Sequence, residues 1–533
     1  MLTGLLFFVR GLQLQCVYPP LEGPDEYQHI AYLTYIEEEG KIPVLNKALV
    51  PKSLYPHFLA NPHSDCDVQQ TGKVGCLPYE AFYEKEAMQK RGEKFLIPEN
   101  FMENETAQTG EPDIQLYESQ QPPLYYILAW PVFAHIRDSL GFREAIYTLR
   151  IINIALATIA MLCLLSPIKG VFEESRAMRL SILAISLSPM FMVYVSRVAN
   201  DALALVFAGL AVSVITGMTN QRHLIAKAAI AGGLIGIGVL TKMTVLCILP
   251  AAVVYFWYCA ARTRMTFGKA FLCSAAAIGC YLIFTMQYHL QNYRDFGTVF
   301  PSFDTIENAA AGKTFFHLAG NIQLLHLKDF FLNTLIRGNL WVSGWSFLMP
   351  RNELRVIYFW ILVVSALGIV PYIISVIRRT TKRPMFHPHI VLCGLLVIFS
   401  FAAAYGHALN SIARWGVITT MSYYVMISYP AFLICIFACA RGYGKKGASA
   451  AAFVFAVFFL VTEYVSLSGG AVQRWTGATD FRVIFERLSS VHPVFPGPYF
   501  FFPLAIIVCV LTAGLMFLAF CGERQDNEGQ RTE

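Results

Sequence analysis

Stretches of about twenty apolar residues recur along the whole chain, and they restrict its fold more than any other feature. A helix needs about 20 apolar residues to cross a hydrocarbon core that is about 30 Å thick. Of the 533 residues, 56% are hydrophobic and 14% are charged, whereas about 25% are charged in an average soluble domain. A β-barrel would instead show short segments of alternating polarity. The sequence therefore predicts an all-α, polytopic membrane protein.

Twelve membrane spans are predicted from these stretches. The first is short and contains Arg10, which indicates a tilted, distorted helix or an incomplete N-terminus; no cleavage site of a secretory signal peptide follows it. The spans are residues 1–17, 145–166, 178–196, 199–218, 225–241, 242–260, 268–288, 355–377, 389–406, 415–440, 448–466 and 500–521.

The distribution of lysine and arginine predicts the side on which each loop lies, because cytoplasmic loops carry an excess of both. With the N-terminus inside, the inner connectors hold fifteen of these residues, and the short outer turns hold only Arg197, Lys242 and Arg414. We therefore expect both termini in the cytoplasm, the second as a disordered tail at 522–533. The long loops 18–144, 289–354 and 467–499 are expected on the extracytoplasmic side.

The first outer loop is strongly acidic and long enough to hold structure of its own. Residues 18–121 contain eighteen Asp and Glu against eight Lys and Arg, a balance that argues against nucleic acid as a partner. Cys66 and Cys76 lie ten residues apart in this loop, and an oxidising compartment would permit a disulfide between them.

Local patterns predict four segments within this loop. Residues 26–39 and 78–92 have the periodicity of helices, the first of which ends at Gly40. Residues 98–113 read as a mobile segment. The apolar stretch from Pro122 to Ile136 is expected to be a helix lying in the outer membrane interface rather than a further span.

The sequence Glu22-Gly-Pro-Asp-Glu-Tyr-Gln-His29 places two adjacent carboxylates where the chain leaves the first span. Transfer of a sugar from a phosphate to a hydroxyl requires one carboxylate to accept the proton, and Pro24, which restricts the backbone, favours Asp25 for this role. The alternative is structural: Asp25 caps the helix that follows, and Glu26 interacts with the helix dipole in its first turn.

Further polar residues are candidates for substrate binding. His29 follows Asp25 by one helical turn and so shares its face, although a lone histidine is more often a hydrogen-bonded surface residue. A polar cluster precedes Pro122-Pro123, where an ordinary loop end is the alternative; it consists of Tyr117, Glu118, Gln120 and Gln121.

The three outer cations are candidates for contacts with a lipid phosphate. Lys242 is expected at the depth of the lipid headgroups. The planar guanidinium of Arg414 can donate two hydrogen bonds to the oxygens of one phosphate, which lysine cannot do in the same geometry. Extension of each side chain to the headgroups is the alternative. For Arg197, a self-contained salt bridge with Asp201 is favoured over a ligand contact.

The order of short motifs along the chain resembles that of the GT-C membrane glycosyltransferases. The motifs are EGPDEYQH, ESQQPPLYY, RIIN, SRVAND, LTK and ARWG. The superfamily includes the protein O-mannosyltransferases and aminoarabinose transferases, and the chain looks most similar to a branch of predicted membrane proteins within it.

The resemblance implies an inverting transferase that uses a polyprenyl- or dolichyl-phosphate sugar. It places Asp25 at the catalytic base, Glu26 beside it, and Lys242 and Arg414 at the donor phosphate. It implies no required cofactor, and Mg²⁺ or Mn²⁺ held by Asp25, Glu26, His29 and Glu118 is an alternative. The acceptor, whether glycan, protein or lipid, is not indicated. A transporter or flippase of lipid-linked sugars and a non-catalytic scaffold are the competing interpretations.

Overall fold

The computed structural model describes residues 1–93, 113–172, 175–220, 222–262, 265–313, 324–341, 343, 344, 346, 348, 350–377, 387–419, 422–444 and 446–529. Within these residues the chain is helical, with two isolated β-bridges and no strand. This confirms the prediction of an all-α fold.

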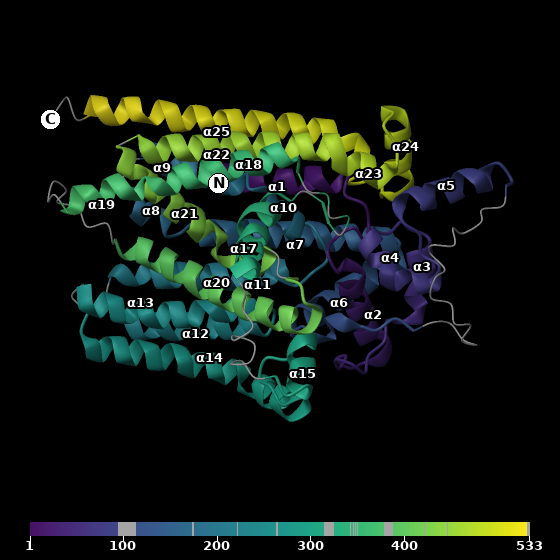
Figure 1. Ribbon diagram of the computed structural model, residues 1–533, viewed down its shortest axis with the longest axis horizontal. Helices are drawn as coiled ribbons and strands as arrows, with labels where there is room; N and C mark the ends of the chain where they lie inside the picture. Colours follow the sequence, from purple (N-terminus) through teal and green to yellow (C-terminus); the bar gives the residue numbers. More distant parts are fainter. Residues whose placement is uncertain are drawn as a thin grey trace.

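Long helices, together with the shorter helices that connect or continue them, lie side by side in a bundle, seen from one side in Figure 1. They are α1 (Leu2–Gln15), α7 (Phe142–Leu164), α8 (Ile168–Val171), α9 (Ser175–Ser186), α10 (Pro189–Val195), α11 (Asp201–Thr216), α12 (Leu224–Val239), α13 (Ile248–Arg262), α14 (Phe267–Phe296), α18 (Asn352–Leu367), α19 (Ile369–Ile377), α20 (Pro388–Trp415), α21 (Tyr429–Ala440), α22 (Gly447–Ser466) and α25 (Phe501–Gly529).

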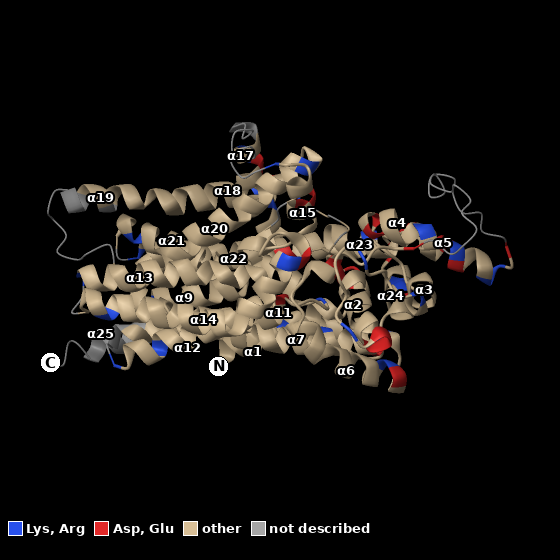
Figure 2. Cartoon of the chain, turned by 90° about the horizontal axis from the view of Figure 1, so that it is seen from below, with Lys and Arg blue, Asp and Glu red and all other residues tan. Residues whose placement is uncertain are grey.

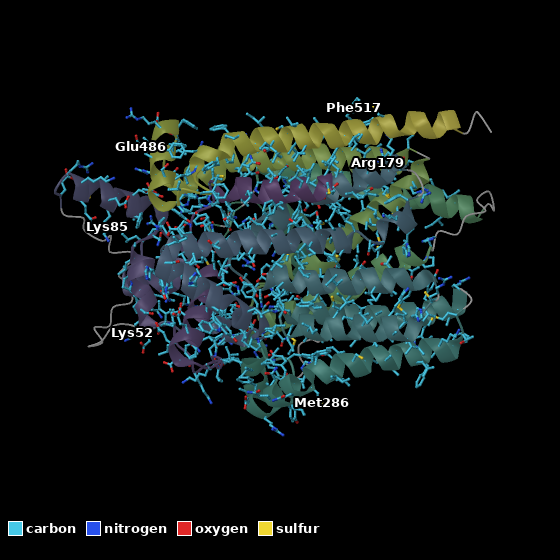
Figure 3. The ribbon with its side chains drawn as sticks, turned by 180° about the vertical axis from the view of Figure 1, so that it is seen from behind. Lys52, Lys85, Arg179, Met286, Glu486 and Phe517 are labelled. Atoms are coloured by element: carbon cyan, nitrogen blue, oxygen red, sulfur yellow. The ribbon has the colours of Figure 1, made fainter. Side chains whose placement is uncertain are left out.

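Shorter helices from the predicted outer loops gather mainly at one end of this bundle, apart from α17 (Leu324–Phe331), which lies about midway along it (Figure 1). They are α2 (Glu26–Glu39), α3 (Tyr55–Leu59), α4 (Asp65–Thr71), α5 (Tyr79–Lys90), α6 (Leu124–Ser139), α15 (Phe303–Ala310), α17 (Leu324–Phe331), α23 (Val472–Thr476) and α24 (Phe481–Val491). Lys52 and Lys85 mark this end in Figure 3, and Arg179 and Phe517 lie in the other half of the molecule.

Within the described residues, eight helical segments are long and apolar enough to cross a membrane, or nine if the bent pair α9 and α10 forms one span. The helices α11 and α12 are apolar but shorter, and α1 has 14 residues. All twelve predicted spans are therefore largely helical, and a multi-pass membrane protein is confirmed. The number of crossings stays a prediction.

The predicted span 178–196 is broken, because its two helices meet at an angle of 45° where Pro189 begins α10. The break exposes backbone carbonyls, and Arg10 donates hydrogen bonds to two of them, those of Ser186 and Leu187. Arg10 also forms a buried ion pair with Glu463 of α22. The charge of Arg10 thus joins α1 to the broken span.

Several predicted boundaries need correction. The spans predicted at 268–288 and 389–406 continue as helices to Phe296 and Trp415, and α25 continues to Gly529, where a disordered tail was predicted. The outer-loop predictions are closer: α2 ends at Gly40, whose φ of 62° suits glycine, and α5 and α6 form as expected. The segment 98–113 lies almost wholly outside the described residues. Cys66 and Cys76 are free thiols.

Acidic side chains gather at the end of the molecule that carries α2 to α6, where lysines and arginines also lie, whereas the opposite end shows lysines and arginines with hardly any acid (Figure 2). The second end thus has the excess of basic residues that was predicted for the cytoplasmic connectors. The acidic end contains the candidate site.

Candidate functional site

Asp25 stands at the first position before α2, yet its carboxylate does not cap that helix. Its backbone is left-handed, with φ 57° and ψ 13°, and its side chain makes no capping hydrogen bond. Instead, the hydroxyl of Tyr117 donates a 2.5 Å hydrogen bond to the Asp25 carboxylate. Left-handed backbone at a residue other than glycine is strained and is concentrated at functional sites. The capping alternative for Asp25 is therefore excluded.

The neighbouring acids of the same motif are buried, whereas Asp25 is half-buried. Glu22 and Glu26 are both 0% exposed. A Cβ atom on Gly23 would lie 2.6 Å from the Cβ of Arg197, so only glycine allows the motif to pack this closely. Asp25 is thus the one acid of this motif with a carboxylate that solvent or a ligand can reach.

Glu26 is held by Arg150 of α7 in a fully buried ion pair. The guanidinium donates to the Glu26 carboxylate over 2.5 and 2.8 Å, and the backbone amide of Val198 donates to it over 2.7 Å. Arg150 also donates to the carbonyls of Tyr18 and Pro19. This pair fixes the start of α2, and hence the backbone of Asp25, against the first and second spans.

Glu22 joins three outer segments of the chain. Its carboxylate accepts hydrogen bonds from the hydroxyl of Tyr79 at 2.8 Å and from the amide and hydroxyl of Ser346 at 3.0 and 2.9 Å. Burial raises the pKa of Glu22 to about 7, while these hydrogen bonds oppose the rise. The motif is therefore anchored on both sides of Asp25.

Glu118 and His29 face one another beside Asp25. Their nearest nitrogen and oxygen atoms are 3.9 Å apart, and His29 Nδ1 lies 2.7 Å from the hydroxyl of Tyr126. Burial raises the pKa of Glu118 to about 8, and the charge of Asp25 adds to the rise. Burial also lowers the pKa of His29 well below its usual value, with a further contribution from nearby cations. At neutral pH, both side chains are therefore mainly uncharged.

Two of the outer cations share one carboxylate. Arg197 and Lys242 bind the two oxygens of Asp201, at 2.7 and 2.6 Å, and Arg197 also donates to the carbonyl of Pro24. The ring of Tyr423 covers both cations, with its centroid 5.8 Å from the Arg197 guanidinium and 5.5 Å from the Lys242 ammonium. The salt bridge predicted for Arg197 is confirmed, and Lys242 is part of it.

Gln121 extends the site toward α11 and the end of α12. Its side-chain oxygen accepts a 3.1 Å hydrogen bond from Asn200, which also donates to the carbonyl of Thr241. The next residue toward the N-terminus, Gln120, accepts a 3.2 Å bond from the backbone amide of Phe303. The short helix η4 (Tyr117–Gln120) and Gln121 thus contact several parts of the chain at once.

Arg414 lies in a separate cluster at the end of α20. Its side chain stacks on Phe303 and Trp415, 3.9 and 4.6 Å from the ring centroids, and lies 3.7 Å from the Asp304 carboxylate. None of the ion pairs described for Arg414 involves the other predicted site residues. Its connection to them runs through Phe303 and Gln120.

The donor set predicted for a divalent ion does not converge. Glu26 is bound to Arg150, and His29 directs one ring nitrogen at Tyr126. In the described part of the chain, no three His, Cys, Asp or Glu side chains are grouped to hold one ion. Metal dependence stays a prediction, and the chemistry proposed below uses no metal.

Three contributors to the site were not predicted from the sequence: Arg150, Asp201 as the shared anion, and Tyr423. Arg150 is part of the RIIN motif, and an arginine inside an apolar stretch is a signal that a buried anion is close. The sequence around Tyr423 contains no signal that distinguishes this residue from other tyrosines at the membrane interface.

The fold and the charged cluster at one end of its helices define a multi-pass membrane protein with a buried polar site. The sequence profile of a family described as predicted membrane proteins, DUF2142, matches residues 7–412. The chain belongs to this family, which confirms the predicted branch. The sequence matches none of the curated proteins with which it was compared.

Solved structures show a distant overall likeness. The apo oligosaccharyltransferase of Archaeoglobus fulgidus is 14% identical, with a TM-score of 0.47; the alignment covers 93% of this chain and 58% of the archaeal protein. ArnT of Cupriavidus metallidurans, bound to undecaprenyl phosphate, is 13% identical, with a TM-score of 0.39 and coverage of 98% and 76%. The chain thus spans little more than half the length of the archaeal enzyme.

Proposed function

We propose that the protein is an inverting membrane glycosyltransferase of the GT-C type, with Asp25 as the general base. The observation that carries the proposal is the state of the Asp25 carboxylate: it is half-buried, held by Tyr117 and not used as a helix cap. The order of the sequence motifs supports the same assignment. The donor is a sugar on a polyprenyl phosphate, because the site adjoins membrane-spanning helices and holds two cations.

In the proposed step, a hydroxyl of the acceptor attacks C1 of the sugar from the side opposite the phosphate. Its proton passes to the Asp25 carboxylate as the new C1–O bond forms. The bond from C1 to the phosphate oxygen breaks, and the leaving polyprenyl phosphate keeps the electron pair and gains a negative charge. The product has the opposite anomeric configuration, and the next cycle begins when Asp25 releases its proton to water.

Arg197 and Lys242 supply the electrostatic stabilisation in this proposal. While Asp25 is ionised, its charge and that of Asp201 balance the two cations. When Asp25 accepts the proton, the cluster keeps one unbalanced positive charge at the moment when the phosphate gains a negative one. Preorganised charges of this kind stabilise a transition state because they need no rearrangement as the reaction proceeds.

The remaining predicted residues take supporting roles. Glu26 is a positioning residue, since both of its oxygens are bound by Arg150 and one also by Val198. Glu118 and His29, uncharged at neutral pH, add no competing charge next to the base. Arg414 belongs to the adjoining cluster around Phe303 and is assigned to the far part of the donor or acceptor.

Reconstitution into liposomes tests this function. The purified chain is supplied with labelled polyprenyl-phosphate sugars and a mixture of acceptors, and three quantities are followed: polyprenyl phosphate, sugar product and its anomeric configuration by NMR. We expect polyprenyl phosphate to be released in step with a product of inverted configuration. Movement of the intact lipid-linked sugar across the bilayer without cleavage would show a transporter. If the sugar is neither cleaved nor moved, the protein is a non-catalytic scaffold.

A further inference from the structure

A cavity of about 130 Å³ adjoins the candidate site, because Gln121, which contacts Asn200 of that site, is one of its lining residues. Its walls come from the chain after α2, from the end of η4, and from the last turns of α14. In Figure 3, Met286, two residues before this part of α14, lies at the edge of the molecule. The lining thus joins the last turns of α14 to the predicted first outer loop, which supplies residues 42–45, 119–121 and 123.

The chemistry of the walls is that of a site for hydroxyl groups. Most of the polar groups are side-chain amides and a hydroxyl, which both donate and accept hydrogen bonds. One carboxylate is also present, and it can accept hydrogen bonds from two hydroxyls at once. The polar lining residues are Ser119, Gln120, Gln121, Gln291, Asn292 and Asp295. Tyr288 and Phe296 add aromatic surface, which suits the apolar faces of a sugar ring.

The charge of the lining restricts the ligand further. Among the described residues that form the cavity, Asp295 is the one charged side chain, and none is lysine or arginine. A phosphate or carboxylate would meet a like charge with no cation to offset it. The cavity is also smaller than the pockets of about 300 Å³ or more that bind drug-sized molecules, so it fits a single terminal unit.

The cavity is connected to the candidate base through a series of contacts. Tyr288 lies beside Tyr32, whose hydroxyl donates to the carbonyl of Gln121 over 3.4 Å. Tyr32 stacks on Tyr126 with 3.7 Å between ring centroids, and the Tyr126 hydroxyl contacts His29.

Gln121 provides a second and shorter connection. It lines the cavity and precedes Pro122 in the chain, while Glu118, three residues earlier, faces His29 beside Asp25. A ligand held in the cavity therefore lies next to the segment that carries the residues in contact with Asp25.

We infer that this cavity is the acceptor subsite and that it binds a neutral sugar unit, so that the acceptor is a glycan rather than a peptide or a charged lipid. The inference rests on the proposed function. It assigns Asp295 and Gln291 as specificity residues, because both are exposed at the cavity and neither lies in the cluster around Asp25.

Acceptor specificity is the test. The protein in liposomes, loaded with a labelled polyprenyl-phosphate sugar, is offered neutral methyl glycosides, a glucuronide, or a peptide containing Ser and Thr. We expect the neutral glycosides to accelerate release of polyprenyl phosphate above the rate of donor hydrolysis. Asp295→Asn should raise the KM for the glycoside about tenfold, the loss expected for one hydrogen bond to a charged group. Asp138→Asn, at an exposed acid of α6, is the matched control.

Binding without turnover separates failure of the inference from failure of the proposed function. Saturation-transfer NMR with methyl glycosides should show contact in the wild type and in Asp138→Asn, and weaker contact in Asp295→Asn. Equal use of the glucuronide or preference for the peptide would overturn the inference, as would an unchanged KM in Asp295→Asn. Glycoside binding with no donor cleavage would refute the proposed function and leave a sugar-binding site.

Discussion

The buried pair of Glu26 and Arg150 gives a prediction that separates a positioning role for Glu26 from a catalytic one. Removing one partner of a buried ion pair costs about 3–5 kcal/mol, because the other charge is left without compensation. The loss of stability in Arg150→Met should lie at the upper end of this range, because the substitution leaves a buried carboxylate without its partner. It also removes the donors to Gln15, Tyr18 and Pro19. The loss of stability in Glu26→Gln should lie at the lower end, because the amide oxygen of glutamine can still accept the hydrogen bond from the backbone amide of Val198.

The double variant should be more stable than the sum of the single losses implies. A coupling energy of about 2–3 kcal/mol is expected, near the upper end of the range for residues in contact. Unfolding by SDS in mixed micelles, followed by tryptophan fluorescence, measures the free energy of unfolding of the wild type, the two single variants and the double variant. Glu37→Gln is the control on the same helix: its partly exposed pair with Arg137 should contribute at most about 1 kcal/mol.

The same variants distinguish the two roles in a transfer assay. If Glu26 only positions Asp25, Glu26→Gln should lose activity and the double variant should regain part of it along with its stability. A double variant that is stable but as inactive as Glu26→Gln would show that the carboxylate itself takes part in the chemistry. Additive stability losses would refute the energetic argument.

Three further predictions concern the groups around Asp25. Tyr117→Phe removes a hydrogen bond to the ionised carboxylate, worth about 1.5–3 kcal/mol, so the acid limb of the pH–rate profile should move up by about one to two pH units; an unchanged profile would contradict this contact. The folded-state pKa of Glu118, about 8 against a usual 4.5, means that stability should fall as pH rises from about 4.5 to about 8, because the folded protein then binds the extra proton. Glu118→Gln should flatten this fall in thermal unfolding, and an equally steep fall would refute the assignment. Lys242→Gln should lower kcat about 10²–10³-fold, because it removes one of the two preorganised cations that face the leaving phosphate; an unchanged kcat would exclude this role for Lys242.

The membrane spans could be predicted because each is a local property of the sequence. Apolar length and periodicity identify α7, α14 and α22 without knowledge of their neighbours. The break between α9 and α10 was missed although Pro189 stands at it, since proline occurs both in the first turn of a helix and at kinks, and the sequence alone does not distinguish the two. The helix ends beyond 288 and 406 were missed because polar residues, which signal a loop in a soluble protein, also occur where a helix leaves the bilayer.

The site was predicted in part, and the division follows the distance between partners in the chain. Asp25, Tyr117 and Glu118 stand in motifs with unusual local sequence, and the fold does bring them together. The partners of Glu26 and Lys242 depend on contacts across 124 and 41 residues, with Arg150 and Asp201. No periodicity or motif spacing encodes such pairs, so the sequence could indicate the charges and not how they are compensated.

Single-turnover kinetics of Asp25→Asn, with labelled donor bound before the acceptor is added, test the central claim most directly. Asparagine still accepts the hydrogen bond from Tyr117 but cannot take the proton, so transfer should slow by about 10²–10⁴-fold while donor binding and thermal stability remain near those of the wild type. Transfer within a few-fold of the wild-type rate would show that another group accepts the proton and that Asp25 is not the base.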